Sequence, residues 1–140
     1  MTTDSAGLQV LSPDECIALL ASVPIGRIVY TDRALPAVQP VSFHLDGERI
    51  IIRTSRGSKL ALAAGDAVVA FQTDEYDAES GTGWSVTVVG RAKSVVDPDE
   101  VMALGRLPLN PWAPVGPDHF IVVDLQQLSG RRIQRQTVSS

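Results

Sequence analysis

Apolar and polar residues alternate in short runs along most of the chain, a pattern typical of β-strands. In the run 84–96, even positions from 86 to 90 would face one side of a sheet and odd positions the other. One face is wholly apolar and the other mixed, as expected for a strand between a core and a second surface. Six such runs predict strands: Ile25–Thr31, Ala37–Leu45, Arg49–Thr54, Ala67–Thr73, Trp84–Val96 and His119–Leu128.

Three shorter segments carry helical signals instead. Ser12-Pro13-Asp14-Glu15 supplies a Ser cap, a proline at the first helical position and a glutamate that completes a capping box. Asp97-Pro98 begins a second helix that runs through Leu104, and Leu60–Ala64 is a third, short one. Helices in so few places, with strands joined by tight turns such as Asp46-Gly47, favour an antiparallel sheet, which can close into a barrel without exposed edges.

The length of 140 residues favours a single domain. We expect it to span residues 8–133, with flexible polar ends at 1–7 and 134–140. The acidic segment from Asp74 to Gly83 is expected to be a solvated loop, because it lacks the ligand spacing of a calcium loop.

Charge and cysteine content exclude several classes of partner. A net charge of −4 and a pI near 5.0 argue against binding to nucleic acids or anionic membranes. Cys16 is the only cysteine, so the chain cannot form an internal disulfide. Neither a signal peptide nor a stretch of about 20 apolar residues is present. We therefore expect a cytoplasmic protein.

The sequence lacks the usual hydrolase and metal-site motifs. Its two histidines, His44 and His119, are far from Cys16, so no zinc site or other metal site is predicted. No Gly-x-Ser-x-Gly, Gly-x-Gly-x-x-Gly or Walker motif occurs. Redox chemistry would therefore need a bound cofactor.

One segment concentrates groups that bind anions. Arg53-Thr54-Ser55-Arg56-Gly57-Ser58-Lys59 holds three cations, three hydroxyls and a glycine in seven residues. It lies between a predicted strand and a predicted helix, where backbone N–H groups point outward and could hold a phosphate. A solvated turn with scattered charges is the alternative.

Four motifs follow one another in an order that carries a resemblance: Gly26-Arg27-Ile28; Pro36-x-x-x-Pro40-Val41-Ser42-Phe43; Ile52-Arg53-Thr54 with Gly57-Ser58-Lys59-Leu60; and Gly83-Trp84-Ser85-Val86-x-Val88-x-Gly90-Arg91-Ala92. In this order they resemble the pyridoxamine 5'-phosphate oxidase-like family of FMN-binding split barrels, from about Leu11 to Ile133. The segment Gly130–Ile133 lacks the Arg-x-His or Trp-rich signature of true pyridoxamine phosphate oxidases. The resemblance is closer to a small actinobacterial-type branch related to nitroimidazole reductases.

The resemblance implies a mainly β fold with a few helices, a six-stranded antiparallel split β-barrel that forms a homodimer with FMN at the subunit interface. It places the phosphate at Arg53, Thr54, Ser58 and Lys59, and the isoalloxazine ring beside Pro40, Val41, Ser42 and Phe43. Trp84 and Ser85 would reach the partner's flavin, with interface packing as the alternative role of Trp84. Val41, Phe43 and Ile52 are expected to line an apolar slot for the ring.

The expected activity is that of a flavin-dependent oxidoreductase that reduces a small electrophile, such as a nitro compound or quinone, with a reduced nicotinamide. Hydride would move directly between the substrate and the flavin, so no catalytic side chain is assigned. Two alternatives stay open. One is a deazaflavin-dependent reductase with a basic groove that includes Arg56, Arg131 and Arg132. The other is a non-catalytic flavin or heme carrier, in which His44 is the reason for considering heme.

Overall fold

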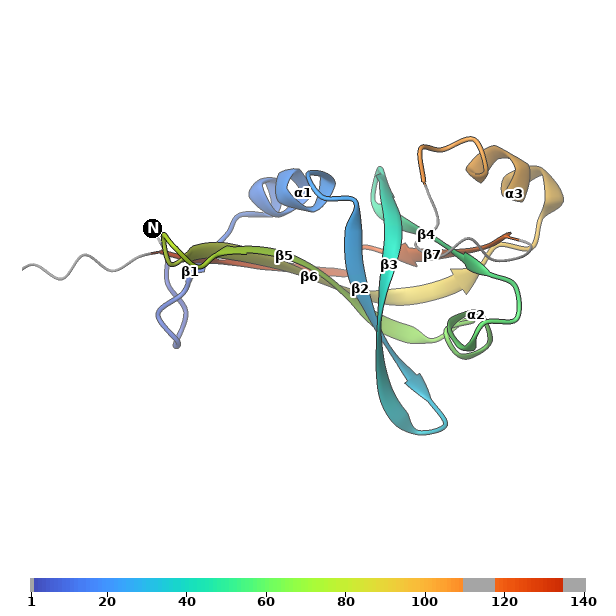
Figure 1. The fold of residues 1–140 in the computed structure, drawn as a ribbon, viewed down its shortest axis with the longest axis horizontal. Coiled ribbons are helices and arrows are strands. Elements are labelled where there is room, and N and C mark those ends of the chain that lie inside the picture. Colours follow the sequence, from blue (N-terminus) through green and yellow to red (C-terminus); the bar gives the residue numbers. More distant parts are fainter. Residues whose placement is uncertain (1, 110–117, 135–140) are drawn as a thin grey trace, which may run out of the picture.

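The computed structural model describes residues 2–109 and 118–134. Within these residues, short helices flank an extensive antiparallel sheet (Figure 1). The strands are β1 (Gln9–Val10), β2 (Ile25–Asp32), β3 (Leu35–Asp46), β4 (Arg49–Ser55), β5 (Val68–Asp77), β6 (Thr82–Ser94), β7 (Asp118–Asp124) and β8 (Gln127–Ile133). The helices are α1 (Pro13–Ala21), α2 (Lys59–Ala63) and α3 (Pro98–Leu104). None of the helices in the described ranges is long and apolar enough to cross a bilayer.

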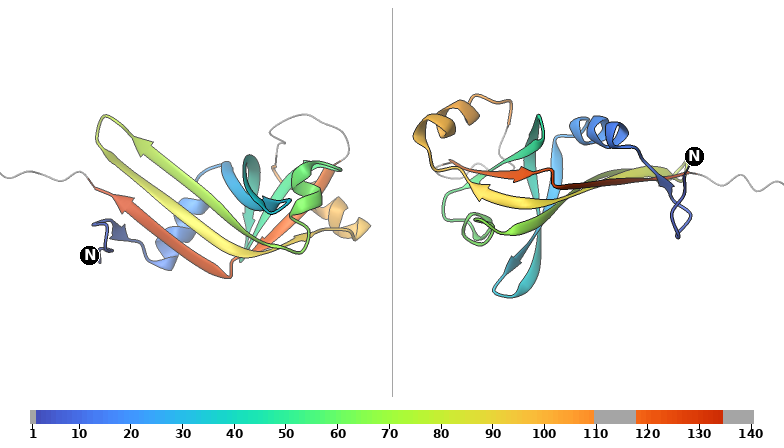
Figure 2. Two further views of the ribbon diagram at one scale, coloured as in Figure 1. Left: turned by 90° about the horizontal axis from the view of Figure 1, so that it is seen from below. Right: turned by 180° about the vertical axis from the view of Figure 1, so that it is seen from behind.

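Six strands close into a ring. Neighbouring strands pair antiparallel in the order β2, β3, β4, β7, β6 and β5, and β5 pairs again with β2. This ring confirms the six-stranded antiparallel barrel that the sequence predicts. β8 and β1 continue the sheet beyond the ring, so β5, β6 and β8 form a flatter extension on one side of it (Figure 2).

The strand β6 belongs to both the ring and the extension. Val89 pairs with Gln127 on β8, whereas Ala92 pairs with Val123 on β7. Gly90 lies on β6 between the part that pairs with β8 and the part that pairs with β7. A Cβ atom on Gly90 would lie 1.8 Å from the Asp124 carbonyl oxygen. Only glycine allows this close approach of two backbones.

The expectation of one strand over His119–Leu128 is wrong. The chain forms β7 and β8 with Leu125 and Gln126 between them: β7 pairs with β4 and β6, whereas β8 pairs with β6 and β1. The Leu125 N–H donates to the Glu48 carbonyl, and the Arg91 N–H donates to the Gln126 side chain.

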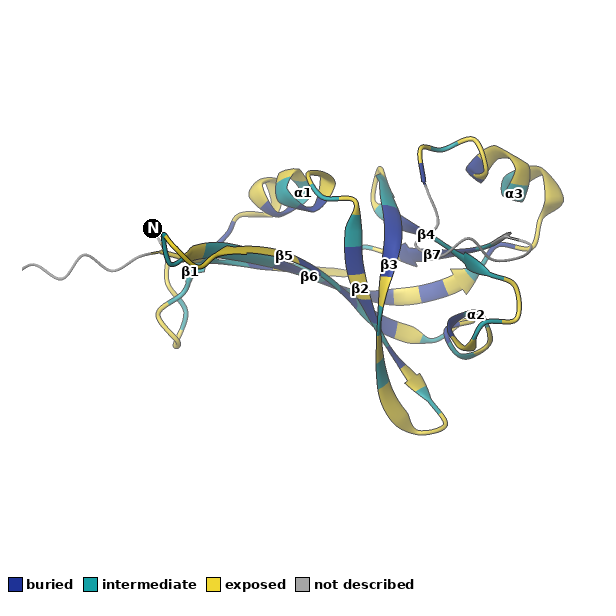
Figure 3. Ribbon diagram, in the orientation of Figure 1, coloured by how far each residue is buried: buried dark blue, intermediate teal, exposed yellow. Residues whose placement is uncertain are grey.

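The acidic segment is also more ordered than expected. β5 continues to Asp77 and β6 begins at Thr82, so the predicted loop from Asp74 to Gly83 is mostly a strand pair with a turn at 78–81. Its side chains are largely exposed (Figure 3), which explains why a strand of this composition is stable in water.

Strands β4 and β7 are covered on both sides. Ile50 and Ile52 pack in the main cluster inside the ring, here called the barrel core. Ile51, between them, packs on the other side in an outer cluster under α3, made of Ile51, Val95, Leu104, Leu109, Phe120 and Val122. This double coverage explains the continuous apolar runs at 50–52 and 120–123.

Local signals fix α1 as predicted. The Ser12 hydroxyl accepts a hydrogen bond from the Glu15 N–H at 3.2 Å, and the Glu15 carboxylate accepts one from the Ser12 N–H at 3.1 Å. This is the capping box expected from the sequence. α1 then packs against β8 at the extension.

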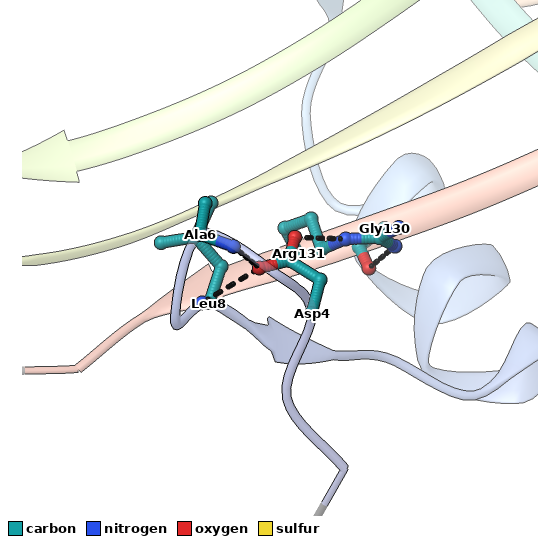
Figure 4. A network of polar contacts seen from close by, with 5 residues as sticks. All are labelled: Asp4, Ala6, Leu8, Gly130 and Arg131. Carbon is teal, nitrogen blue, oxygen red and sulfur yellow. Dashed lines mark hydrogen bonds and ion pairs between the residues drawn. The ribbon is translucent and has the colours of Figure 1, made fainter.

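The N-terminal residues are tied to β8 through Asp4. Its carboxylate accepts hydrogen bonds from the Ala6 and Leu8 N–H groups and from the Arg131 guanidinium, the last at 2.8 Å (Figure 4). The Leu8 hydrogen bond, followed by the one from Arg131, lowers the pKa of Asp4. Arg131 is thereby engaged at the far end of the extension.

Candidate functional site

The turn after β4 brings two predicted phosphate-binding hydroxyls together. Ser55–Ser58 is closed by a hydrogen bond from the Ser58 N–H to the Ser55 carbonyl, with Gly57 at φ 83°. The Thr54 and Ser58 hydroxyls are 3.1 Å apart. Ser58 also caps α2, because its hydroxyl accepts from the Ala61 N–H at 3.1 Å. The turn is therefore a preformed arrangement of hydroxyls at the start of α2.

Arg53 points to the opposite side of β4 from Thr54, because consecutive strand residues face opposite ways. Its guanidinium donates to the Leu109 carbonyl at 2.9 Å and lies 5.9 Å from the centroid of the Phe120 ring. Arg53 thus borders the outer cluster under α3, while Thr54 continues the side of the barrel core. The two residues are neighbours in sequence but face different surfaces.

Lys59 lies beside the turn and also borders a separate cavity. The exposed side chain opens α2 directly after Ser58. It contributes to a cavity of about 520 Å³ between α2 and the tip of the β2–β3 hairpin, here called the hairpin hollow, which is lined by Thr31, Asp32, Arg33, Lys59, Leu62 and Ala63. Lys59 is therefore the predicted phosphate-binding cation that is exposed next to the Thr54–Ser58 pair.

The predicted ring-binding segment on β3 divides between two sides. Val41 and Phe43 are buried in the barrel core, where the Phe43 and Phe71 ring centroids are 4.7 Å apart. Ile52 is buried there too, and the apolar slot expected from these three side chains stays a prediction. The side chains of Val41, Phe43 and Ile52 pack in the interior of the barrel.

Pro40 and Ser42 face the other side of β3. One position beyond the Phe43–Ile52 pair, Ser42 and Arg53 lie on neighbouring strands and point to the same outward side. Pro40, which pairs with Arg27, is exposed. Ser42 is buried although it faces outward, so this region offers a ligand the backbone of β3 and the partly exposed Arg53.

Trp84 and Ser85 lie at the far end of β6. Trp84 packs against the barrel core, and Ser85 faces the other side between Asp74 and Arg131. Ser94, which lies next to the turn, is nine positions after Ser85 on β6, and this spacing corresponds to roughly 30 Å of strand. A single chain therefore does not bring these two residues to the Thr54–Ser58 pair.

His119 is a polar residue near the turn that the sequence did not assign to the site. It pairs with Thr54 across β4 and β7, and its Nε2 lies 3.0 Å from the Ser94 hydroxyl. Burial, followed by the nearby charge of Arg56, lowers the pKa of His119 below its ordinary value of 6.5. The sequence did hold a signal for this position. His119 is two residues before the apolar Ile121 in a predicted strand, and strand alternation therefore predicts that both side chains face inward.

This lowered pKa predicts a pH-dependent stability. As pH falls through 6.5, the unfolded chain takes up a proton at His119 before the folded chain does, so the free energy of unfolding decreases. The slope is bounded by about 1.4 kcal/mol per pH unit for one proton. Urea unfolding between pH 7.5 and 5.5 measures it. His119→Gln should flatten the dependence, and an unchanged slope in this variant would contradict the assignment.

His44 lies in a different place from the turn. It lines a cavity of about 320 Å³ between the end of α1 and β3, together with Ala21, Ser22, Val23, Pro24, Phe43, Leu45 and Pro108. It is partly exposed and faces outward on β3. Among the described residues, no group of three or more His, Cys, Asp or Glu side chains could hold a metal ion.

Comparison with known proteins decides the family. The family model described as "Pyridoxamine 5'-phosphate oxidase" matches residues 12–132. The chain belongs to this family. Within the family, it is 41% identical over 128 residues to the uncharacterized protein Rv0080 of Mycobacterium tuberculosis, a match that covers 88% of this chain and 84% of that protein.

Solved structures of similar proteins share the family fold. A FAD binding protein from Mycobacterium smegmatis is 35% identical, with a TM-score of 0.75 over 90% of this chain and 98% of that one. A conserved protein of unknown function from Corynebacterium diphtheriae is 28% identical, with a TM-score of 0.75 over 91% and 98% of the two chains. These likenesses confirm the split-barrel fold expected from the resemblance.

Proposed function

We propose that the chain is a flavin-dependent oxidoreductase that holds a phosphate-bearing flavin at the turn between β4 and α2. The observation that carries this proposal is the pair of Thr54 and Ser58 hydroxyls, 3.1 Å apart, followed directly in sequence by the exposed Lys59. A dianionic phosphate favours hydroxyl donors combined with a cation. Membership of the family and the FAD binding relative support the same ligand class.

Each residue has a distinct role in this proposal. Lys59 supplies the charge for the phosphate, and Thr54 and Ser58 supply hydroxyl contacts. Ser42 and Arg53 face the other side of β3 and β4 and take no part in holding the phosphate, whereas the backbone of Pro40–Phe43 would lie beside the flavin ring. When bound, the flavin would supply hydride transfer, with a reduced nicotinamide as donor and a small nitro compound or quinone as acceptor. No side chain of this chain is assigned as an acid or base.

A homodimer is part of the proposal, because a row of apolar residues crosses the outer face of the sheet and is partly exposed. Val29 on β2 pairs with Val38 and Ala70, and Ala70 pairs with Val89, so an apolar row crosses four strands. Val38 is 63% exposed. A row of this kind fits a second copy of the chain. The partner would then present Trp84 and Ser85 to the flavin, which one chain cannot do.

The alternative of a deazaflavin with a long anionic tail has less support. Its expected groove needs Arg56 together with Arg131 and Arg132. Arg56 lies near His119, whereas Arg131 and Arg132 form ion pairs with Asp4 and Glu15 at the other end of β6. Within residues 2–109 and 118–134, these three arginines therefore do not line one groove of a single chain.

Replacing Lys59 by alanine tests the phosphate site. A charge-assisted contact contributes about 1.5–3 kcal/mol, so Lys59→Ala should weaken FMN binding about 10- to 100-fold. Riboflavin, which lacks the phosphate, should bind the variant and the natural chain equally. Quenching of flavin fluorescence measures both affinities.

Lys93→Ala is the matched control, because Lys93 is an exposed lysine on β6. It should bind FMN as the natural chain does. Arg53→Ala is less informative, since Arg53 also contacts Leu109 and Phe120. Equal affinity of the natural chain for FMN and riboflavin would refute the site.

A further inference from the structure

The hairpin hollow lies directly beyond the proposed phosphate site. One wall is the tip of the β2–β3 hairpin, which projects past the ring, and the other is α2, which packs against β2 (Figure 1). Lys59 belongs to both places, because it follows Ser58 of the turn and also lines the hollow. A ligand that extends from the turn across Lys59 therefore arrives in this hollow.

The hollow contains two cations from distant parts of the chain. Arg33 comes from the hairpin tip and Lys59 from α2. In the part of the chain that the structure describes, neither forms an ion pair with a carboxylate, although Asp32 also lines the hollow. In a chain of net charge −4, this local excess of positive charge favours an anionic ligand.

An apolar wall lies beside these cations. Leu62 on α2 is 78% exposed although it is a large apolar residue, and Ala63 follows it at the edge of the hollow. An apolar surface next to cations suits a planar base linked to a phosphate. The volume of about 520 Å³ falls within the range of about 300–1,000 Å³ that is usual for small-molecule sites.

We propose that the hairpin hollow binds the adenylate half of FAD, so that the chain prefers FAD over FMN. Arg33 and Lys59 contact the second phosphate, and the adenine lies against Leu62. This inference rests on the proposed flavin site, which holds the first phosphate at Thr54, Ser58 and Lys59. FMN has no group to place in the hollow.

The experiment compares FAD and FMN binding to the full chain, freed of flavin and titrated by fluorescence quenching. The natural chain should bind FAD at least about tenfold more tightly than FMN, which is the contribution of one charge-assisted contact. Arg33→Asn should lower the affinity for FAD to that for FMN and leave FMN binding unchanged. Asparagine suits the φ of 52° at this position, so the turn is preserved. Arg33→Lys, which keeps the charge, should retain the preference.

Two further variants keep the test decisive. Leu62→Asp changes the α2 wall without touching the hairpin, and it should also weaken FAD but not FMN. Arg106→Asn removes an exposed arginine after α3 and should change neither affinity. Equal binding of FAD and FMN to the natural chain would overturn the inference while leaving the flavin site intact. Binding of neither flavin would refute the proposed function as well.

Discussion

Gly90→Ala is expected to destabilise the fold by at least about 3 kcal/mol, and to abolish soluble expression if the natural chain is only marginally stable. The new Cβ atom would lie 1.8 Å from the Asp124 carbonyl oxygen and 3.0 Å from its carbonyl carbon. Both are backbone atoms, so no rotamer change relieves the clash. The strands β6 and β7 would have to separate where the ring meets the extension. Urea unfolding followed by tryptophan fluorescence measures the loss.

Gly105→Ala is the matched control for this variant. Gly105 ends α3 with helical φ of −63°, and the nearest atoms to an added Cβ are 3.5 Å away. Alanine is favourable in this conformation, so the free energy of unfolding should change by less than about 1 kcal/mol. If Gly90→Ala were as stable as Gly105→Ala, the close approach of β6 to Asp124 would be refuted.

Gly26→Ala is expected to lower the free energy of unfolding by about 2–3 kcal/mol, through a clash with a side chain instead of with the backbone. A Cβ atom on Gly26 would lie 2.2 Å from Cζ of Phe71 and under 3.0 Å from both Cε atoms. Phe71 is fully buried and packs edge-on against Phe43, so its ring has no room to move away. The clash is therefore with one identifiable side chain.

Phe71→Leu makes this explanation testable, because leucine lacks the three atoms that the new methyl group would meet. The single change should cost roughly 1–2 kcal/mol for the lost packing. In the Phe71→Leu background, Gly26→Ala should then cost at least about 1 kcal/mol less than it does alone. Urea unfolding of the four proteins gives this coupling. Additive costs would show that Gly26 is constrained by something other than the ring.

Local signals in the sequence predicted the local structure well. The capping box at Ser12 and Glu15 forms, and a turn at 47–48 joins β3 to β4, one residue after the predicted Asp46-Gly47. Changes of strand partner were not predictable. The apolar run 120–123 and the residues after it carry no break at Leu125, because both β7 and β8 are strands and only their partners differ.

The acidic end of β5 was missed for a related reason. Beyond the Arg27–Gln72 pair, β5 has β6 as its partner on one side while β2 turns away. An exposed strand edge tolerates charges such as Asp74, Glu75 and Asp77, which also discourage pairing with other molecules. The amino-acid composition of this end of β5 therefore resembles that of a loop.

The candidate site was predictable as a segment but not as an arrangement. The motif from Arg53 to Lys59 marks the turn correctly, and Thr54 and Ser58 meet there. The predicted strand Arg49–Thr54 already puts Arg53 and Thr54 on opposite sides, but only the structure shows that the outer cluster under α3 covers the side of Arg53. His119 comes from β7, 65 positions after Thr54, and only the strand register brings the two together.

The continuity of β6 through the ring and the extension bears on how the molecule comes apart. A strand of thirteen residues that pairs with β5, β7 and β8 leaves no boundary at which one half could melt while the other persists. Loss of β8 would remove a neighbour from residues 83–89 of β6, and loss of β7 would remove one from residues 92–94. We therefore expect the chain to unfold as one cooperative unit, in which a destabilising change near Trp84 also destabilises the turn that precedes Lys59.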